Sequence, residues 1–181
     1  MRNKEEAQKT KGKWFPYNKG GEFRKWYGNN DHIVNYKDDG IEIKESVLKK
    51  YPYLKTPDFV VKNTEYYFHE CFSWSKVSSG IAAFRYKPCG FIFDVAGACC
   101  FSDLYLQYLL ALCNSKISLC ILEMVSPTIN YECGAIANIP VIVGHGKTEI
   151  VNTTTQNNVS LSKNDWDSFE TSWDFKKHPM I

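Results

Sequence analysis

Hydroxyl, cationic and aromatic side chains are mixed in one short stretch of the chain, CFSWSKVSSGIAAFRYKP, at residues 71–88. Serine, lysine and arginine contact phosphates, and they also hydrogen-bond to base edges in the major groove of DNA. Trp74 and Phe84 could pack beneath such a surface or flank a base. The residue types indicate a nucleic-acid-binding surface. A sheet with a polar outer face and an aromatic inner face would show the same pattern.

Motifs of the common catalytic sites are absent from the sequence. Neither G-x-G-x-x-G nor G-x-x-x-x-G-K-[ST] occurs, and no serine lies in a G-x-S-x-G setting. His69 and Glu70 are a His–acid neighbour pair, but adjacent residues on a strand point to opposite faces. Cys71 beside them is more typical of a buried thiol than of a nucleophile. We therefore expect a binding module with no catalytic residues.

No metal site is predicted either. The seven cysteines include no C-x-x-C spacing. The acidic pair Asp38/Asp39 fits a turn, and the pair Asp165/Asp167 fits the start of a helix, where acids are common without a metal.

Cysteine use and hydropathy favour a cytoplasmic protein. Cys113 and Cys120 lie in an apolar helical run and are expected to be buried thiols in a reducing compartment. No apolar signal segment and no run of 18 apolar residues occurs, so no membrane partner is expected.

Composition divides the chain into four parts. Residues 1–27 contain eight Lys and Arg against three Glu, so positive charge is concentrated at the N-terminus. We expect a disordered basic tail over 1–12, a folded domain over 13–143, a polar linker over 144–162 and an amphipathic helix within 163–181. That helix would carry an aromatic stripe of Trp166, Phe169 and Trp173.

The periodicity of apolar residues predicts an α+β fold, with a mixed or antiparallel curved sheet and a helical pair. Strands are expected at 22–28, 32–36, 64–75, 81–86, 90–97 and 137–143. A helix is expected at 41–51, and the helical pair at 102–116 and 116–125.

Long blocks of the sequence carry a family resemblance. They are KWFPYNKGGEFRKWYGNND, IVNY, DGIEIK, FSWSKVSSG, FRYKPCGFIFDVAG, YLLALCNSK, SPTINYECGAIANIPVI and DWDSFETSWDF, in this order between residues 13 and 179. The chain resembles the target-recognition region of adenine-specific DNA methyltransferases from BREX phage-defence systems, the PglX family. The helical pair and the NIPVI block are also similar to target-recognition domains of type I restriction specificity subunits and type IIG enzymes.

This resemblance implies a restriction-modification target-recognition fold. It also implies two partners, double-stranded DNA and a methyltransferase catalytic domain or other defence subunit. The family's catalytic core uses an N-P-P-Y-type tetrapeptide and a glycine-rich strand end that holds S-adenosylmethionine. Neither is present, and NIP at 138–140 does not replace the tetrapeptide. We therefore expect a recognition domain without the methyltransferase core, which performs no methyl transfer and holds no cofactor alone.

Residue type and block position, rather than the resemblance, predict which side chains face DNA. Lys19, Arg24 and Lys25 are expected to contact phosphates. The rest of the DNA-facing set comes from residues 71–88, namely Ser75, Lys76, Ser78, Ser79, Arg85 and Lys87. The alternative is a module that docks on a methyltransferase core or another defence subunit and binds no DNA alone. Steep loss of binding with salt would favour DNA.

Overall fold

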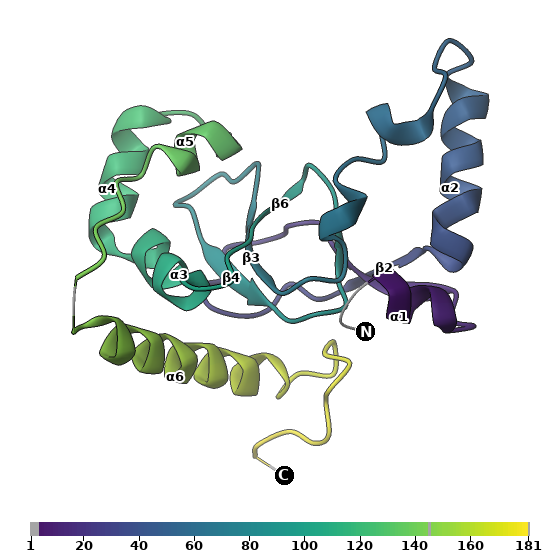
Figure 1. Cartoon of the computed structure of the whole chain (residues 1–181). Helices are drawn as coiled ribbons and strands as arrows, with labels where there is room; N and C mark the ends of the chain where they lie inside the picture. Colours follow the sequence, from purple (N-terminus) through teal and green to yellow (C-terminus); the bar gives the residue numbers. More distant parts are fainter. Residues whose placement is uncertain (1–3, 145, 181) are drawn as a thin grey trace.

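The computed structural model describes residues 4–144 and 146–180, and it shows an α+β fold with two small sheets at its centre (Figure 1). The first sheet has the strand order β2-β1-β5 and the second the order β4-β3-β6. Their bounds are β1 Trp14–Asn18, β2 His32–Asn35, β3 Cys71–Ser75, β4 Phe84–Lys87, β5 Ile92–Phe93 and β6 Gly97–Cys100.

Strand pairing differs between the two sheets. In the first, β1 runs antiparallel to β2 and parallel to β5. The second is antiparallel throughout, with Ser73 of β3 opposite Arg85 on one side and Cys99 on the other. Every residue of β3 is buried. Both faces of the second sheet are therefore covered, which places polar side chains of alternate residues inside the protein.

Helices lie on both flanks of the sheets (Figure 1). On one flank is α2, and on the opposite flank are α3, α4 and α5, with α6 packed along α3. The helices are α1 Lys4–Lys9, α2 Lys37–Lys50, α3 Leu106–Asn114, α4 Lys116–Val125, α5 Cys133–Ala137 and α6 Thr148–Trp166, with 3₁₀ turns at Pro57–Phe59 and Thr64–Tyr66.

Two hydrophobic cores result from this arrangement. The larger one packs Phe72, Trp74 and Phe84 of the second sheet against helices that include Leu110 of α3 and Leu122 of α4. The smaller one lies beside the first sheet and is largely aromatic, with edge-to-face contacts of Phe15, Tyr36, Tyr67 and Phe68. Such contacts add to the stability from apolar burial.

The predicted helical pair is confirmed as α3 and α4. Ser115 separates the two helices and caps α4, because its Oγ accepts a 3.2 Å hydrogen bond from the backbone N–H of Ser118. The helix α2 and the strands β2, β3 and β4 also form within or across their expected ranges.

The structure differs from the expected strands in four places. Residues 64–70 form no strand, because Thr64–Tyr66 is a 3₁₀ turn, so only the last part of 64–75 becomes β3. Residues 22–28 form no strand, because Trp26 has a φ of 70°, which breaks an extended backbone. Residues 137–143 form none, because α5 continues to Ala137 and Pro140 lacks an N–H for a ladder. Residues 90–97 are divided between β5 and β6, which lie in different sheets. Two small sheets therefore replace the single curved sheet.

The terminal segments also differ from expectation. Most of the polar stretch 144–162, expected as a linker, is helical, since α6 spans Thr148–Trp166 and buries Thr155. The expected helix over 163–181 stops at Trp166, where Ser168 donates a 2.6 Å hydrogen bond back to the carbonyl of Asp165. The N-terminal tail contains the short helix α1, with Ala7 buried.

Over the described ranges, no single helix is long and apolar enough to cross a membrane. α3 and α4 would pass that test together, but they are bent by 68°.

Candidate nucleic-acid interface

The connection between β3 and β4 is fixed to a second loop that is distant in sequence. The N–H of Ser78 donates to the carbonyl of Ile129 at 2.9 Å, and the N–H of Tyr131 donates to the carbonyl of Lys76 at 2.7 Å. Val77 and Asn130 form an antiparallel bridge between them. We call residues 76–80 and 126–132 together the platform. Its backbone is held on both sides, so its side chains have defined positions.

The platform carries small polar side chains together with two exposed apolar ones, Val77 and Ile129. Ser79, Thr128 and Asn130 are exposed and Ser78 is half-buried. Hydroxyl groups bind phosphates or base edges, and an asparagine amide can pair with adenine through two hydrogen bonds. Sequence reasoning missed Asn130, because only the fold brings residues 126–132 beside residues 76–80.

Two lysines of the expected DNA-facing set lie near the C-terminal end of β3. Lys76 is half-buried and pairs with Glu132 of the platform at 3.0 Å. Lys19 is exposed, and the next residue, Gly20, packs so closely on β3 that an added Cβ would lie 3.3 Å from Cα of Ser75. Lys76 is therefore part of the platform, and the backbone next to Lys19 lies close to the same end of β3.

Ser75 has an internal role instead. It is 9% exposed, and its Oγ donates to the carbonyl of Gly21 at 2.7 Å and accepts from Nη2 of Arg85 at 3.0 Å. Its side chain thus fastens the segment around Gly21 to the second sheet.

The expectation that Arg85 and Lys87 face DNA is not met, because these side chains are 1% and 0% exposed. They alternate with Phe84 and Tyr86 along β4, and they point to the sheet face that residues 19–30 cover. Burial lowers the pKa of Arg85 to about 10. Burial and the neighbouring Arg85 lower the pKa of Lys87 to about 7.

Both buried cations bind the covering segment rather than solvent. Lys87 Nζ donates to the backbone carbonyls of Gly28 and Asn29 at 2.9 and 3.0 Å, and to the side-chain oxygen of Asn30 at 2.5 Å. Arg85 reaches the carbonyl of Arg24 at 3.4 Å. These contacts hold residues 22–30 in place.

Arg24 and Lys25 lie beside the helices instead of at the platform. Arg24 pairs with Asp165 at 2.8 Å and lies over the ring of Trp166, 5.0 Å from its centroid. Lys25 Nζ donates to the carbonyl of Asn114 at the end of α3. The structure thus separates these two residues from the platform.

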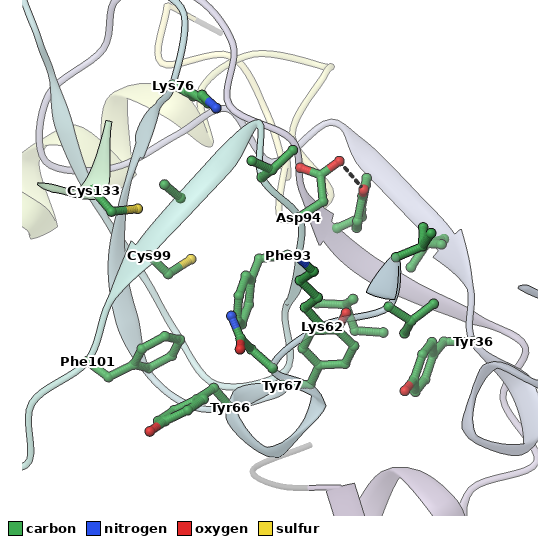
Figure 2. Close-up of a pocket in the computed structure, with 18 of the residues that line it drawn as sticks. Tyr36, Lys62, Tyr66, Tyr67, Lys76, Phe93, Asp94, Cys99, Phe101 and Cys133 are labelled. Atoms are coloured by element: carbon green, nitrogen blue, oxygen red, sulfur yellow. Dashed lines mark hydrogen bonds between the residues drawn. The ribbon is translucent and has the colours of Figure 1, made fainter. Parts of the chain in front are cut away.

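A pocket of about 650 Å³ adjoins the platform (Figure 2). The platform residues Lys76, Tyr131 and Glu132 form part of its wall. Figure 2 shows the sulfurs of Cys99 and Cys133 directed into it, from the side opposite to Tyr36. Aromatic side chains form much of the remaining wall, and they include Tyr17, Tyr36, Tyr66, Tyr67, Phe93 and Phe101.

Metal-ligating residues do not gather at this site. Within residues 4–144 and 146–180, no group of three or more His, Cys, Asp and Glu side chains could hold a metal ion. A side-chain hydrogen bond with Cys99, together with burial, raises the pKa of the Cys71 thiol, so this thiol is poorly suited to act as a nucleophile.

Comparison with known proteins relates the chain to adenine-specific methyltransferases. It is 39% identical over 170 residues to the adenine-specific methyltransferase PglX of Lacticaseibacillus casei (strain Zhang), covering 93% of this chain and 14% of that protein. It is 36% identical over 177 residues to the adenine-specific methyltransferase BrxX of Escherichia coli O9:H4 (strain HS), covering 96% of this chain and 13% of that protein.

The chain is thus homologous to a segment of these methyltransferases, and it spans about one-seventh of the length of the curated relatives it matches. No family model matches it.

Proposed function

We propose that the chain is a DNA sequence-recognition module that acts with the catalytic part of an adenine-specific DNA methyltransferase in phage defence. The observation that carries the proposal is the platform, in which backbone hydrogen bonds join two loops that carry exposed hydroxyl and amide side chains, in a chain homologous to such enzymes. Methyl transfer and S-adenosylmethionine binding are assigned to the remaining length of such an enzyme. The sequence of this chain contains neither the N-P-P-Y tetrapeptide nor the glycine-rich strand end.

The division of labour follows from the chemistry of the substrate. An enzyme that modifies a base must take it out of the stack, so its catalytic pocket reads little of the surrounding site. A separate surface must then contact the neighbouring base pairs. In the proposal, Asn130, Ser78 and Ser79 contact base edges, and a good bidentate pair discriminates by about 1–3 kcal/mol. Lys19 and Lys76 contact phosphates, which hold the module in register.

The test is selection from a pool of random duplexes at about 50 mM and about 200 mM salt, two conditions between which phosphate contacts weaken strongly. We expect the wild-type chain to enrich a short motif. Asn130→Ala should relax selectivity at one position of the motif. Lys19→Glu should weaken binding to all sequences and reduce its salt dependence. Asn157→Ala changes an exposed residue of α6 and serves as the matched control.

The outcomes separate this proposal from its alternative. If Asn130→Ala leaves the motif unchanged and Lys19→Glu leaves the affinity unchanged, the assignment of these residues to the DNA-binding surface is contradicted. No retention of DNA at either salt concentration would contradict DNA recognition by the chain itself.

A docking module is the second candidate, and the outer face of α4 favours it. Ile117, Met124 and Val125 are exposed on this helix, and Ile142 is exposed in the loop before α6. Exposed apolar residues that gather on one surface mark protein interfaces. The proposed occupant is the catalytic part of a methyltransferase, because the relatives are about seven times longer than the matched segment. Binding through this face would change little with salt.

A further inference from the structure

Four aromatic rings form a continuous row along one side of the pocket. The rings of Tyr66 and Phe101 lie 5.0 Å apart at 34°, Phe101 lies 5.5 Å from Phe93, and Phe93 lies 5.2 Å from Tyr67. Phe93 and Phe101 are only half-buried, and Tyr66 is 46% exposed at the opening. Tyr66, Phe93 and Phe101 therefore keep part of their surface accessible where they line the pocket, whereas Tyr67 is 5% exposed and belongs to the smaller core.

Polar groups accompany this aromatic row. The Asp94 carboxylate accepts a hydrogen bond from the Tyr17 hydroxyl and two from the N–H groups of Ala96 and Gly97. An ionised carboxylate has about four acceptor positions, so one remains for a donor in the pocket. Lys62 lines the pocket as an exposed cation (Figure 2).

These features suit one kind of ligand. The volume of about 650 Å³ lies within the range of ~300–1,000 Å³ of small-molecule sites. A planar ring can stack on Tyr66 and Phe101, and its ring N–H or exocyclic amine can donate to Asp94. Lys62 suits an oxygen-rich or phosphorylated substituent outside the ring. Aromatic side chains stack on nucleobases in the same way in single-strand-binding proteins.

We infer that this pocket binds a nucleobase, which is supplied either by a free nucleoside or by a base extruded from DNA held on the adjacent platform. The second source rests on the proposed function, whereas the first does not. The pocket lies directly beside the platform, because the platform residues Lys76, Tyr131 and Glu132 also line the pocket.

The experiment uses 2-aminopurine, whose fluorescence is quenched when it stacks on an aromatic ring. The full chain is titrated with 2-aminopurine nucleoside and, separately, with duplexes that carry 2-aminopurine within the motif selected above. We expect saturable quenching of the free nucleoside, a saturable change in the emission of the duplex, or both, because 2-aminopurine in a duplex is already quenched by its neighbours and its emission changes when it leaves the stack. Tyr66→Ala should weaken this binding about tenfold, as expected for the loss of one stacking ring.

Matched variants keep the result interpretable. Tyr66→Phe retains the ring and should bind as the wild type does. Phe169→Ala removes an exposed ring outside the pocket and should change nothing. Urea unfolding of each variant shows whether it is folded. A saturable change with the nucleoside alone identifies a free nucleoside as the source, and a saturable change with the duplex alone identifies an extruded base.

Absence of a saturable emission change in both titrations would overturn the inference, and so would equal binding by Tyr66→Ala and the wild type. If duplex selection still depends on Asn130 while the emission does not change in either titration, the pocket assignment fails and the proposed function stands.

Discussion

The indole Nε1 of Trp74 donates a 2.9 Å hydrogen bond to the backbone carbonyl of Tyr131, 57 residues further along the chain. Both residues are buried, and the hydroxyl of Tyr131 in turn donates to the carbonyl of Gly80 at 3.0 Å. The core of the second sheet is thereby connected to both halves of the platform. The position of the exposed side chains is set by a buried ring beneath them.

Replacing this ring should loosen the platform. Trp74→Phe removes the donor, leaves the carbonyl of Tyr131 without this partner and shortens a packed side chain. We expect the free energy of unfolding to fall by about 2 kcal/mol. We also expect faster amide exchange at Ser78 and Tyr131. Urea unfolding and hydrogen exchange measure the two effects. Trp173→Phe, at a half-exposed ring, is the control, and unchanged exchange at the platform would count against this role for Trp74.

Asn114 connects α3 to β4 through its side-chain amide. Its Oδ1 accepts from the N–H of Phe84 at 3.2 Å, and its Nδ2 donates to the carbonyl of Phe84 at 2.9 Å. Asn114→Ala should lower the free energy of unfolding by about 2 kcal/mol, because a buried N–H loses its partner. Asn157→Ala, at an exposed position of α6, should change the free energy of unfolding little. Equal urea midpoints of the two variants would contradict this prediction.

At Gly97 the two sheets approach each other closely. A Cβ added at this residue would lie 2.3 Å from the backbone carbonyl oxygen of Asn18, whose side-chain Nδ2 donates to Gly97 at 2.9 Å. Gly97→Ala should therefore destabilise the protein by about 3 kcal/mol or more, because backbone must move. Gly134→Ala in α5 meets no atom within 4 Å and should be neutral or slightly stabilising. Thermal unfolding of both variants provides the comparison, and equal midpoints would contradict it.

The buried ammonium of Lys87 should make stability depend on pH. Its pKa is about 7 in the folded chain, and the ordinary value of lysine is about 10.4. Between these values the unfolded chain binds more protons, so the contribution of this group to stability rises with pH by up to about 1.4 kcal/mol per unit.

Lys87→Met removes this titration. We expect the free energy of unfolding of the wild type, minus that of the variant, to increase between about pH 7.5 and about pH 9. Urea unfolding at several pH values measures the difference. Lys177→Met, at an exposed lysine, should give a flat difference, and a flat profile for Lys87→Met would show that this lysine keeps an ordinary pKa.

Local patterns in the sequence were sufficient for elements that depend on near neighbours. The apolar rows of α3 and α4, with Ser115 between them, predict a helical pair because side chains three and four residues apart share one face. Local patterns did not predict elements whose conformation depends on contacts with residues distant in sequence. α6 has a polar sequence, and it is helical where it packs against α3.

The same distinction applies to the candidate site. Residue types alone placed Arg85 and Lys87 with Ser78 and Ser79, since all four occur in one short stretch. The face of β4 that carries Arg85 and Lys87 is covered by a segment about 60 residues earlier, whose carbonyls accept from Lys87. Tertiary structure likewise brings Asn130 beside Ser78, because backbone hydrogen bonds join loops that the sequence separates. The sequence determined which chemical groups are present, and the packing of distant segments decided which of them reach the surface.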